Sequence, residues 1–284
     1  MDALSHVEQV MKPMEPVPAG WTPLVQRLPG VRVAIFDIYG TLLQSAAGDI
    51  SLVSSEASRD GMVLAWQTLG GEGEVDPEHW IARYREEIET QQRRSREIGV
   101  DFPEVEIREV WRNLAKHFLG ETPSEAQVER AALCYECAVN PTWEMPGARA
   151  MIQELRGRRI PLGLISNAQF YTPVVLRAGL GDIVEEFSAE LSLFSYLERR
   201  GKPSQVLFER MRAQLAGKGF SPEEVVYFGN DVRKDILPAR EAGFRTGLFA
   251  GDRRSLRIGD RPESEVREVC DVILTDWSQW KEVL

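Results

Sequence analysis

The sequence has few of the features that mark membrane, secreted or nucleic-acid-binding proteins. It contains only three cysteines and three histidines among 284 residues, and no apolar run approaches the roughly 20 residues needed to cross a bilayer. The opening residues, MDALSHVEQVMKPMEP, lack the charged-then-apolar order of a secretory signal. A formal net charge of −10 disfavours general attraction to nucleic acid or to anionic membranes. We therefore expect a cytoplasmic protein that binds neither.

The few cysteines give no sign of a metal or redox site. Cys134 and Cys137 form a C-Y-E-C pair, but no second pair occurs, and the nearest histidine, His117, is not at ligand spacing. We interpret them as packing residues on one helix. With 43% hydrophobic residues, the chain is able to bury a core without disulfides.

The chain divides into an N-terminal extension, a helical insert and an α/β core. Their predicted bounds are 1–30 for the extension, 49–140 for the insert, and 31–48 with 141–284 for the core. Five prolines in the extension break helix and strand alike, so it is predicted to lie over the domain or to be partly disordered. Apolar residues at helical spacing predict that the insert is an all-helical cap. Small residues and prolines at 44–48 and 140–147 predict two hinges about which this cap moves as a unit.

The core is predicted from strands that alternate with helices. The first strand, 31–38, reads VRVAIFDI, a β-branched apolar run typical of a strand buried on both faces of a parallel sheet. Further strands are expected at 159–166, 183–188, 225–228, 245–249 and 271–275. Helices are expected at 148–156, 173–179, 203–216 and 234–242. These units predict an α/β fold with a doubly wound, mainly parallel sheet, whose ligand site lies at the carboxyl ends of the strands.

Polar segments follow four of these elements. They are DIYGT at 37–41, SN at 166–167, GKP at 201–203 and GNDVRKD at 229–235. Asp37 is the only acid on the first strand, and a carboxylate there can attack phosphorus or carbon to form an ester. Thr41 and Ser166 offer hydroxyl donors to an anionic group, and Asn167 offers an amide. Lys202 offers an ammonium that neutralises both nucleophile and substrate. Taken singly, each residue has a structural explanation without catalysis. Asp37 could be a buried acid in an ion pair, Ser166 a cap at a strand end, and Lys202 a solvated surface charge.

In this order, the segments resemble the motifs of the haloacid dehalogenase-like (HAD) superfamily, D-x-D/Y-G-T, S/T-N, K-P and an acidic G-D-x-x-x-D loop. The resemblance covers residues 31–275 and places the helical insert where the family has its mobile cap. It implies a Rossmann-like hydrolase of a small anionic substrate, with Asp37 as nucleophile. Counted back from the turn at Ala242-Gly243, Asp231 falls on the family's metal-binding acid and Asp235 on its second acid, while Asn230 replaces a frequent glycine.

The same resemblance implies a magnesium site. Asp37, Asp231 and the carbonyl of Tyr39 would supply the few oxygen ligands that a largely hydrated Mg²⁺ takes. The alternative is that Asp231 and Asp235 only place favourable negative charge at the first turn of the next helix.

Tyr39 departs from the phosphatase pattern. Phosphatases of the resembled superfamily usually carry an aspartate here, which protonates the leaving oxygen. A tyrosine is typical of the 2-haloacid dehalogenase branch, which works without metal and lacks the acid at the place of Asp231. Such dehalogenases receive halide on a cap arginine, for which Arg85 is the candidate. A solvated helix face explains Arg85 and its neighbours equally well; these are Arg83, Arg93, Arg94 and Arg96.

Three hypotheses follow. The first, which we favour, is a Mg²⁺-dependent phosphohydrolase that uses Asp37 and manages without the usual carboxylic acid. The second is a metal-independent carbon–halide hydrolase, and the third is a non-catalytic binding member in which Tyr39 marks lost turnover. Dependence of activity or thermal stability on Mg²⁺ distinguishes the first two.

Overall fold

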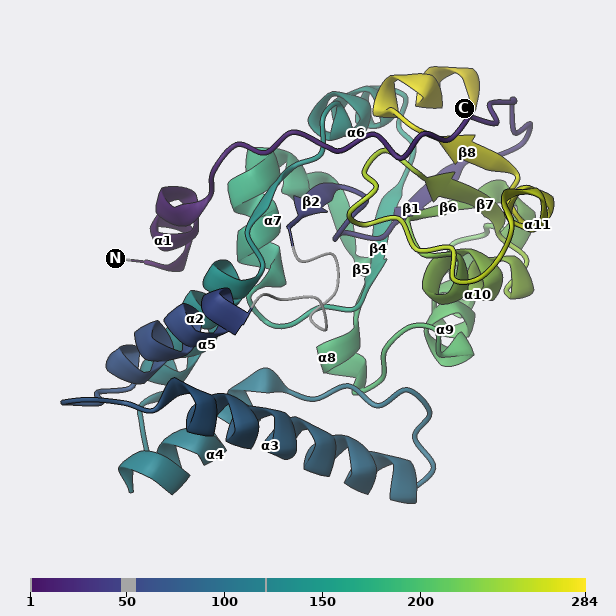
Figure 1. The fold of residues 1–284 in the computed structure, drawn as a ribbon. Coiled ribbons are helices and arrows are strands. Elements are labelled where there is room, and N and C mark those ends of the chain that lie inside the picture. The colour runs from purple at the N-terminus through teal and green to yellow at the C-terminus, as the bar shows by residue number, and fades with distance from the viewer. Residues whose placement is uncertain (1, 47–54, 121) are drawn as a thin grey trace.

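A six-stranded parallel sheet forms the centre of the molecule (Figure 1). The computed structural model describes residues 2–46, 55–120 and 122–284. The strand order is β5-β4-β1-β6-β7-β8. In that order the strands are Phe187–Phe194, Leu162–Ser166, Val33–Phe36, Val225–Gly229, Arg245–Phe249 and Val272–Leu274. Because the chain continues from β1 to β4 on one side and returns to β6 on the other, the topological switch point lies at the end of β1.

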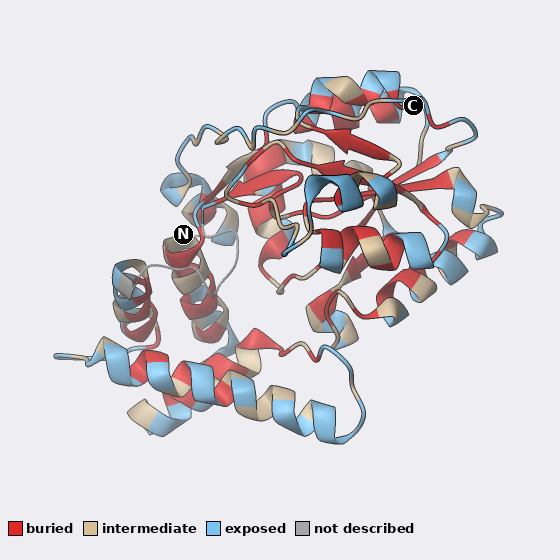
Figure 2. Ribbon diagram, turned by 45° about the vertical axis from the view of Figure 1, so that its right-hand side comes forward, coloured by how far each residue is buried: buried red, intermediate tan, exposed pale blue. Residues whose placement is uncertain are grey.

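Helices cover both faces of the sheet, which confirms the predicted α/β class. Side chains alternate across a strand, so Ala34 and Phe36 of β1 pack with α6 (Ala148–Gly157) and α7 (Thr172–Leu180). Val33 and Ile35 point the other way and pack with α9 (Gln205–Gly217) and α10 (Leu237–Glu241). Figure 2 shows the strands buried between these layers, whose helices expose their outer faces. Other short helices are α8 (Ser195–Glu198), α11 (Glu263–Val269) and the 3₁₀ helices Pro222–Glu224 and Trp277–Glu282.

Two predicted elements are wrong in their bounds. The strand expected at 183–188 is a 3₁₀ helix over Gly181–Glu186, and β5 begins only at Phe187. Because β5 lies at the edge of the sheet, it can keep the charged residue Glu190 exposed. This residue interrupts the apolar run from which the strand could have been predicted. The helix expected at 234–242 is a π-helical turn, Val232–Ile236, that runs into α10, because Asp231 caps the turn and starts it earlier.

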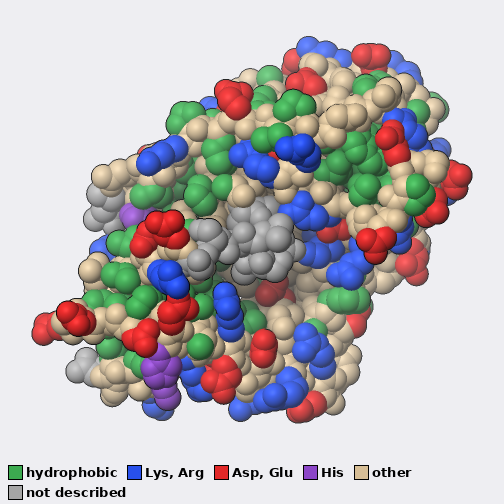
Figure 3. Space-filling model, in the orientation of Figure 1, with side chains coloured by type: hydrophobic (Ala, Val, Ile, Leu, Met, Phe, Trp, Pro, Cys, Tyr) green, Lys and Arg blue, Asp and Glu red, His purple; other side chains and the backbone are tan. Residues whose placement is uncertain are grey.

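A helical insert joins β2 (Leu43–Ser45) to β3 (Thr142–Glu144), two short strands that pair antiparallel. Its helices in the described residues are α2 (Ser55–Thr68), α3 (Pro77–Glu97), α4 (Ile107–Leu119) and α5 (Glu125–Val139). They pack around a cluster of the aromatic rings of Tyr84, Trp111 and Tyr135. Figure 3 shows acidic and basic side chains interspersed over the insert on one face. Its division from the core as a domain stays a prediction.

The connection between α3 and α4 also touches the core. The amide of Gly201 donates to the carbonyl of Phe102 at 2.8 Å, and the amide of Glu104 donates to the carbonyl of Arg199 at 3.2 Å. The insert is therefore attached at a third place besides its two ends. Part of the first expected hinge, residues 47–48, lies outside the described residues, as does the start of the insert at 49–54.

The N-terminal extension lies along the core. Leu24 exchanges both backbone hydrogen bonds with Ile273 of β8, at 2.9 and 2.8 Å, and so covers the edge of the sheet. A helix that we had not expected, α1 (Ala3–Val10), ends before the first proline and packs against α7 and α5. It brings Nε2 of His6 to 3.5 Å from Sγ of Cys134. Among the described residues, no helix combines the length and apolar character that crossing a membrane requires.

Candidate active site

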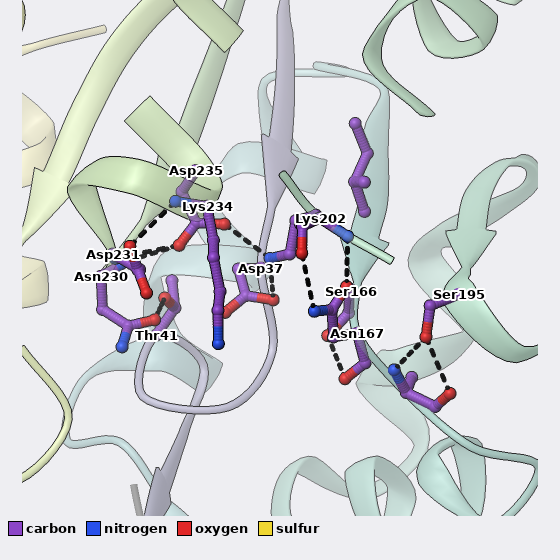
Figure 4. A network of polar contacts seen from close by, with 12 residues as sticks. Asp37, Thr41, Ser166, Asn167, Ser195, Lys202, Asn230, Asp231, Lys234 and Asp235 are labelled. Atoms are coloured by element: carbon purple, nitrogen blue, oxygen red, sulfur yellow. Dashed lines mark hydrogen bonds and ion pairs between the residues drawn. The ribbon is translucent and has the colours of Figure 1, made fainter. Parts of the chain in front are cut away.

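The ends of three central strands bring the predicted motifs together. Asp37 follows β1, Ser166 ends β4 and the loop bearing Asp231 follows β6, so their side chains meet at one edge of the sheet (Figure 4). A cavity of about 350 Å³ lies there. Its described lining includes the following predicted site residues: Asp37, Tyr39, Ser166, Asn167, Lys202, Asp231 and Asp235.

A buried ammonium group links two of the carboxylates. Nζ of Lys202 lies 2.6 Å from Oδ1 of Asp37 and 2.5 Å from Oδ1 of Asp235. It also lies 3.2 Å from the hydroxyl of Tyr227, which is 2.9 Å from the same Asp235 oxygen and 3.1 Å from the carbonyl of Ile165. Figure 4 shows the Lys202 side chain directed between the two carboxylates. The sequence allows two interpretations of these residues, a lysine that neutralises the nucleophile and a buried ion pair of Asp37. Both correspond to the same contact between Lys202 and Asp37.

Burial and the neighbouring charges together set the pKa values of this cluster. It raises the pKa of Asp37 to about 6; the Lys202 ammonium opposes this rise and the nearby Asp235 carboxylate adds to it. Burial alone would lower the pKa of Lys202, but Asp235 and Asp37 outweigh it and hold that pKa above its ordinary value. The lysine therefore stays charged at neutral pH, and Asp37 is ionised above about pH 6.

The loop after β6 holds its two acids by backbone amides. Oδ2 of Asp235 accepts from the amides of Asn230 and Asp231 at 3.1 and 3.0 Å. A Cβ on Gly229 would lie 2.4 Å from Cγ of Asp235, so only glycine fits there. Oδ1 of Asp231 accepts from the backbone amides at 233 and 234, so this acid does place negative charge at the first turn of the following helix. Neither bond involves its Oδ2, which is left for another partner. Burial and the Asp235 carboxylate raise the pKa of Asp231.

Thr41 is placed differently from the expectation. Its hydroxyl donates to Oδ1 of Asn230 at 3.2 Å, it is fully buried, and it is not part of the described cavity lining. The side-chain Nδ2 of Asn230 in turn donates to the carbonyl of Ser255 at 2.6 Å. Gly40 has a positive φ of 86°, and a Cβ there would lie 2.5 Å from that amide nitrogen. Thr41 and Asn230 thus join the loops after β1 and β6, which explains why a side-chain amide stands where the family often has glycine.

Asn167 holds the backbone of Lys202. Its Oδ1 accepts from the Lys202 amide at 2.6 Å, and its Nδ2 donates to the Lys202 carbonyl at 3.2 Å. A Cβ on Gly201 would come within 3.1 Å of the same side chain. Ser166 has only a long contact, 3.5 Å, to the carbonyl of Asn167, so its hydroxyl is free to turn toward the cavity. One N–H of the expected amide donor is therefore used in positioning the lysine.

The hydroxyl of Tyr39 contacts α7 and is not part of the hydrogen bonds recorded for the ion cluster. It lies 3.1 Å from Oγ1 of Thr172. Burial, reinforced by the carboxyl group of Glu136, raises its pKa, so the phenol keeps its proton at neutral pH and is a weak acid. Arg85, the candidate halide receptor, is exposed, and none of the α3 arginines is among the described residues that line the cavity.

Sequence reasoning missed several residues of the site, among them Tyr227, Glu104 and Glu136. Tyr227 belongs to the apolar strand β6, where a hydroxyl among aliphatic neighbours was the only available signal. Glu104 and Glu136 line the cavity from the insert, on segments that carry no motif. They line the same cavity as Asp37 only because of how the insert packs on the core, which the sequence does not show.

Comparison with known proteins agrees with this geometry. The family of haloacid dehalogenase-like hydrolases matches residues 31–243. The chain belongs to this family. As a member it is a hydrolase of the phosphatase or dehalogenase type.

Several curated relatives of this hydrolase are named phosphatases. It is 25% identical to the phosphoglycolate phosphatase of Salmonella choleraesuis over 230 residues, which cover 77% of this chain and 81% of that one. It is 34% identical over 128 residues to the phosphoserine phosphatase of Thermus thermophilus, covering 42% and 48% of the two chains.

Solved structures of both chemical types share the fold. A 2-haloacid dehalogenase from Pseudomonas syringae pv. Tomato DC3000 has a TM-score of 0.56, and a HAD phosphatase from Thermococcus onnurineus has 0.53. Each is 17% identical and covers 89% of this chain and 97% of its own.

Proposed function

We propose that the protein is a Mg²⁺-dependent phosphohydrolase that cleaves a small phosphate monoester with Asp37 as nucleophile. The observation that carries the proposal is the Asp231 carboxylate, which lines the same cavity as Asp37. The metal-independent dehalogenases that the first motif resembles lack this acid. The phosphatase names of the curated relatives support the same chemistry.

The donor set of the cavity fits Mg²⁺. Asp37 and Asp231, with the carbonyl of Tyr39, would hold the ion by oxygen alone, and Mg²⁺ usually keeps several waters besides one or two carboxylates. Within the described part of the chain no group of three His, Cys, Asp or Glu side chains could hold a metal ion, so the Tyr39 carbonyl and water would have to complete the ligand set. The raised pKa of Asp231, caused by burial and then by Asp235, indicates negative charge that a cation would relieve. When bound, Mg²⁺ would withdraw charge from the phosphate oxygens.

The residues of the chain then divide the reaction between them. An Asp37 oxygen attacks phosphorus, the ester P–O bond breaks, and the alcohol leaves and takes up a proton from solvent. Water then cleaves the aspartyl phosphate, which releases inorganic phosphate and restores the carboxylate. Lys202 offsets the charge of nucleophile and phosphate, and the Ser166 hydroxyl donates to a phosphate oxygen. Because the Tyr39 phenol holds its proton tightly, it replaces the usual carboxylic acid poorly.

The Asp231→Asn variant tests the proposal. Wild type is expected to hydrolyse p-nitrophenyl phosphate only with Mg²⁺, and its melting temperature should rise with Mg²⁺ concentration because the ion binds the folded state. Asp231→Asn should lose both responses, whereas Asp260→Asn, the same change at an exposed position, should keep them. Calorimetric titration measures the binding directly. A wild-type protein that shows neither Mg²⁺ binding nor phosphatase activity overturns the proposal.

Tyr39 and the fold shared with a 2-haloacid dehalogenase favour dehalogenation as the second candidate. It predicts metal-independent release of halide from a short 2-halo acid such as 2-chloropropionate. The exposed position of Arg85 removes the expected halide receptor and weakens this candidate. A binding role without turnover would be supported only if neither substrate class reacted.

A further inference from the structure

The cavity has two chemically different walls. One wall is formed by the core motifs around Asp37. The other, which we call the distal wall, is formed by carboxyl and amide side chains of the insert and of the segment after β4. It consists of Gln92, Glu104, Glu136, Asn140 and Gln169. Since a phosphate would bind at the nucleophile on the first wall, the rest of the substrate would extend toward the distal wall.

Glu104 is fixed in the distal wall by three donors. Its Oε2 accepts from the Ser195 hydroxyl at 2.9 Å, and its Oε1 accepts from the Val105 amide at 3.0 Å and from Nε2 of Gln169 at 3.4 Å. Burial raises its pKa, against the effects of these hydrogen bonds and of the Lys234 ammonium. These three hydrogen bonds hold the carboxyl group in place. It is an anionic acceptor when ionised and a neutral group when protonated.

Glu136 is held in a similar way from α5. The hydroxyl of Tyr171 donates to its Oε2 at 2.8 Å, and Nδ2 of Asn140 donates to its Oε1 at 2.9 Å. Burial raises its pKa, and its charge in turn raises the pKa of Tyr39 next to the nucleophile. Neither protonation state of Glu136 or of Glu104 supplies positive charge to a ligand.

The cations of the cavity all come from the core. Among the described residues that line it, these are Lys202, Lys234 and Arg257. Lys202 pairs with Asp37 and Asp235, and Lys234 belongs to the β6 loop, where its ammonium opposes the raised pKa of Glu104. Arg257 exchanges backbone hydrogen bonds with that loop, and Nη1 of its side chain donates to the carbonyls of Arg254 and Leu256. The residues outside the described ranges, 1, 47–54 and 121, contain no lysine or arginine. Among the described residues, the positive charge of the cavity therefore comes from the core, on which Asp37 lies, and not from the side chains of the distal wall.

We infer that the substrate is a phosphate monoester whose leaving alcohol carries hydroxyl or ammonium donors and no carboxylate. This rests on the proposed function and names its substrate class. Carboxyl and amide oxygens accept hydrogen bonds, so they suit donors on the leaving group. A carboxylate on that group would meet like charge in a desolvated cavity. The inference separates this chain from its relatives named phosphoglycolate phosphatase, whose namesake substrate carries a carboxylate.

Three esters that differ in one terminal group provide the test. They are phosphoglycolate, 2-hydroxyethyl phosphate and 2-aminoethyl phosphate, which carry a carboxylate, a hydroxyl and an ammonium on the same two-carbon unit. With Mg²⁺ at pH 7.5, wild-type kcat/KM for the better of the last two should exceed that for phosphoglycolate by at least ~10-fold, or ~1.4 kcal/mol. Equal or greater activity on phosphoglycolate overturns the inference.

Substitutions in the distal wall show whether its charge sets this preference. Glu104→Gln and Glu136→Gln keep the size and remove the carboxylate, so each should raise kcat/KM for phosphoglycolate relative to 2-aminoethyl phosphate by about threefold or more. Glu89→Gln makes the same change on the exposed face of α3 and should leave the ratio unchanged. If both distal variants keep the wild-type ratio, the wall does not set specificity and the inference is wrong.

Hydrolysis of p-nitrophenyl phosphate separates this inference from the proposed function. Its leaving group is activated and needs no donors for the distal wall, so its Mg²⁺-dependent hydrolysis reports the phosphohydrolase reaction alone. Activity on it together with a preference for phosphoglycolate overturns the substrate class and leaves the function standing. No activity on any phosphate ester overturns both.

Discussion

Lys202 is predicted to stabilise the fold by separating two buried acids. Its Nζ lies 2.6 Å from Asp37 and 2.5 Å from Asp235, so the two carboxylate oxygens are at most about 5.1 Å apart. At that distance, two unit charges repel by about 3 kcal/mol with an effective dielectric constant of about 20. Lys202→Met exposes this repulsion, and we expect the free energy of unfolding at pH 8 to fall by about 3 kcal/mol.

The pH dependence of that loss identifies its cause. In wild type the Asp37 pKa is already raised to about 6, above its unfolded value, so protonation favours the folded state as pH falls through 6. Without Lys202, the folded-state pKa rises further, and the variant gains stability from a higher pH than wild type does. The deficit of Lys202→Met should therefore shrink between pH 8 and about 6 and stay constant below that.

Urea denaturation followed by tryptophan fluorescence at pH 8, 7, 6 and 5 measures the deficit. Lys281→Met is the matched control, because Lys281 pairs with Glu154 at 3.0 Å on the surface, where each side chain is about half exposed. Its effect should stay within about 0.5 kcal/mol at every pH. A Lys202→Met deficit under ~1 kcal/mol at pH 8, or one that does not change with pH, would refute the reasoning.

The other predictions concern turnover. Asp37→Asn removes the nucleophile and keeps its shape, so steady-state assays should find no phosphatase activity; activity within about tenfold of wild type contradicts the assignment. In wild type, kcat/KM at low Mg²⁺ should rise with pH through about 6, because only ionised Asp37 attacks, and saturating Mg²⁺ should move this rise to lower pH because the ion favours the carboxylate. A low-Mg²⁺ profile that is flat from pH 5 to 8 argues against this. Tyr39→Asp restores a carboxylic acid near the leaving oxygen and should raise hydrolysis of an alkyl phosphate by about 10²-fold or more. No gain with Mg²⁺ bound normally would count against phosphoester chemistry.

The sequence predicts the residues at strand ends better than their contacts. Asp37, Lys202 and Asp235 were identified because parallel strands bring their carboxyl ends to one edge, whatever the detailed packing. The contacts of Asn167 could not be predicted, since a dipeptide does not show that its side-chain amide binds the Lys202 backbone across 35 positions of the chain. The position of Tyr227 between Lys202 and Asp235 likewise depends on the depth of β6 in the sheet.

The contact between the α3–α4 connection and the core limits how the helical insert can move. Oδ2 of Asp101 accepts from the Ser204 hydroxyl at 2.8 Å, and the Phe102 carbonyl accepts from the Gly201 amide at 2.8 Å. These contacts lie on either side of Lys202, so rotation of the whole insert about two terminal hinges must break them. Opening of the cavity then takes one of two courses. In the first case, the α3–α4 connection stays on the core while the other helices of the insert move. In the second case, movement of the whole insert away from the core breaks these contacts and frees residues 201–204 together with the distal wall. In the second case, access to the cavity and the charge around Asp37 change in one step.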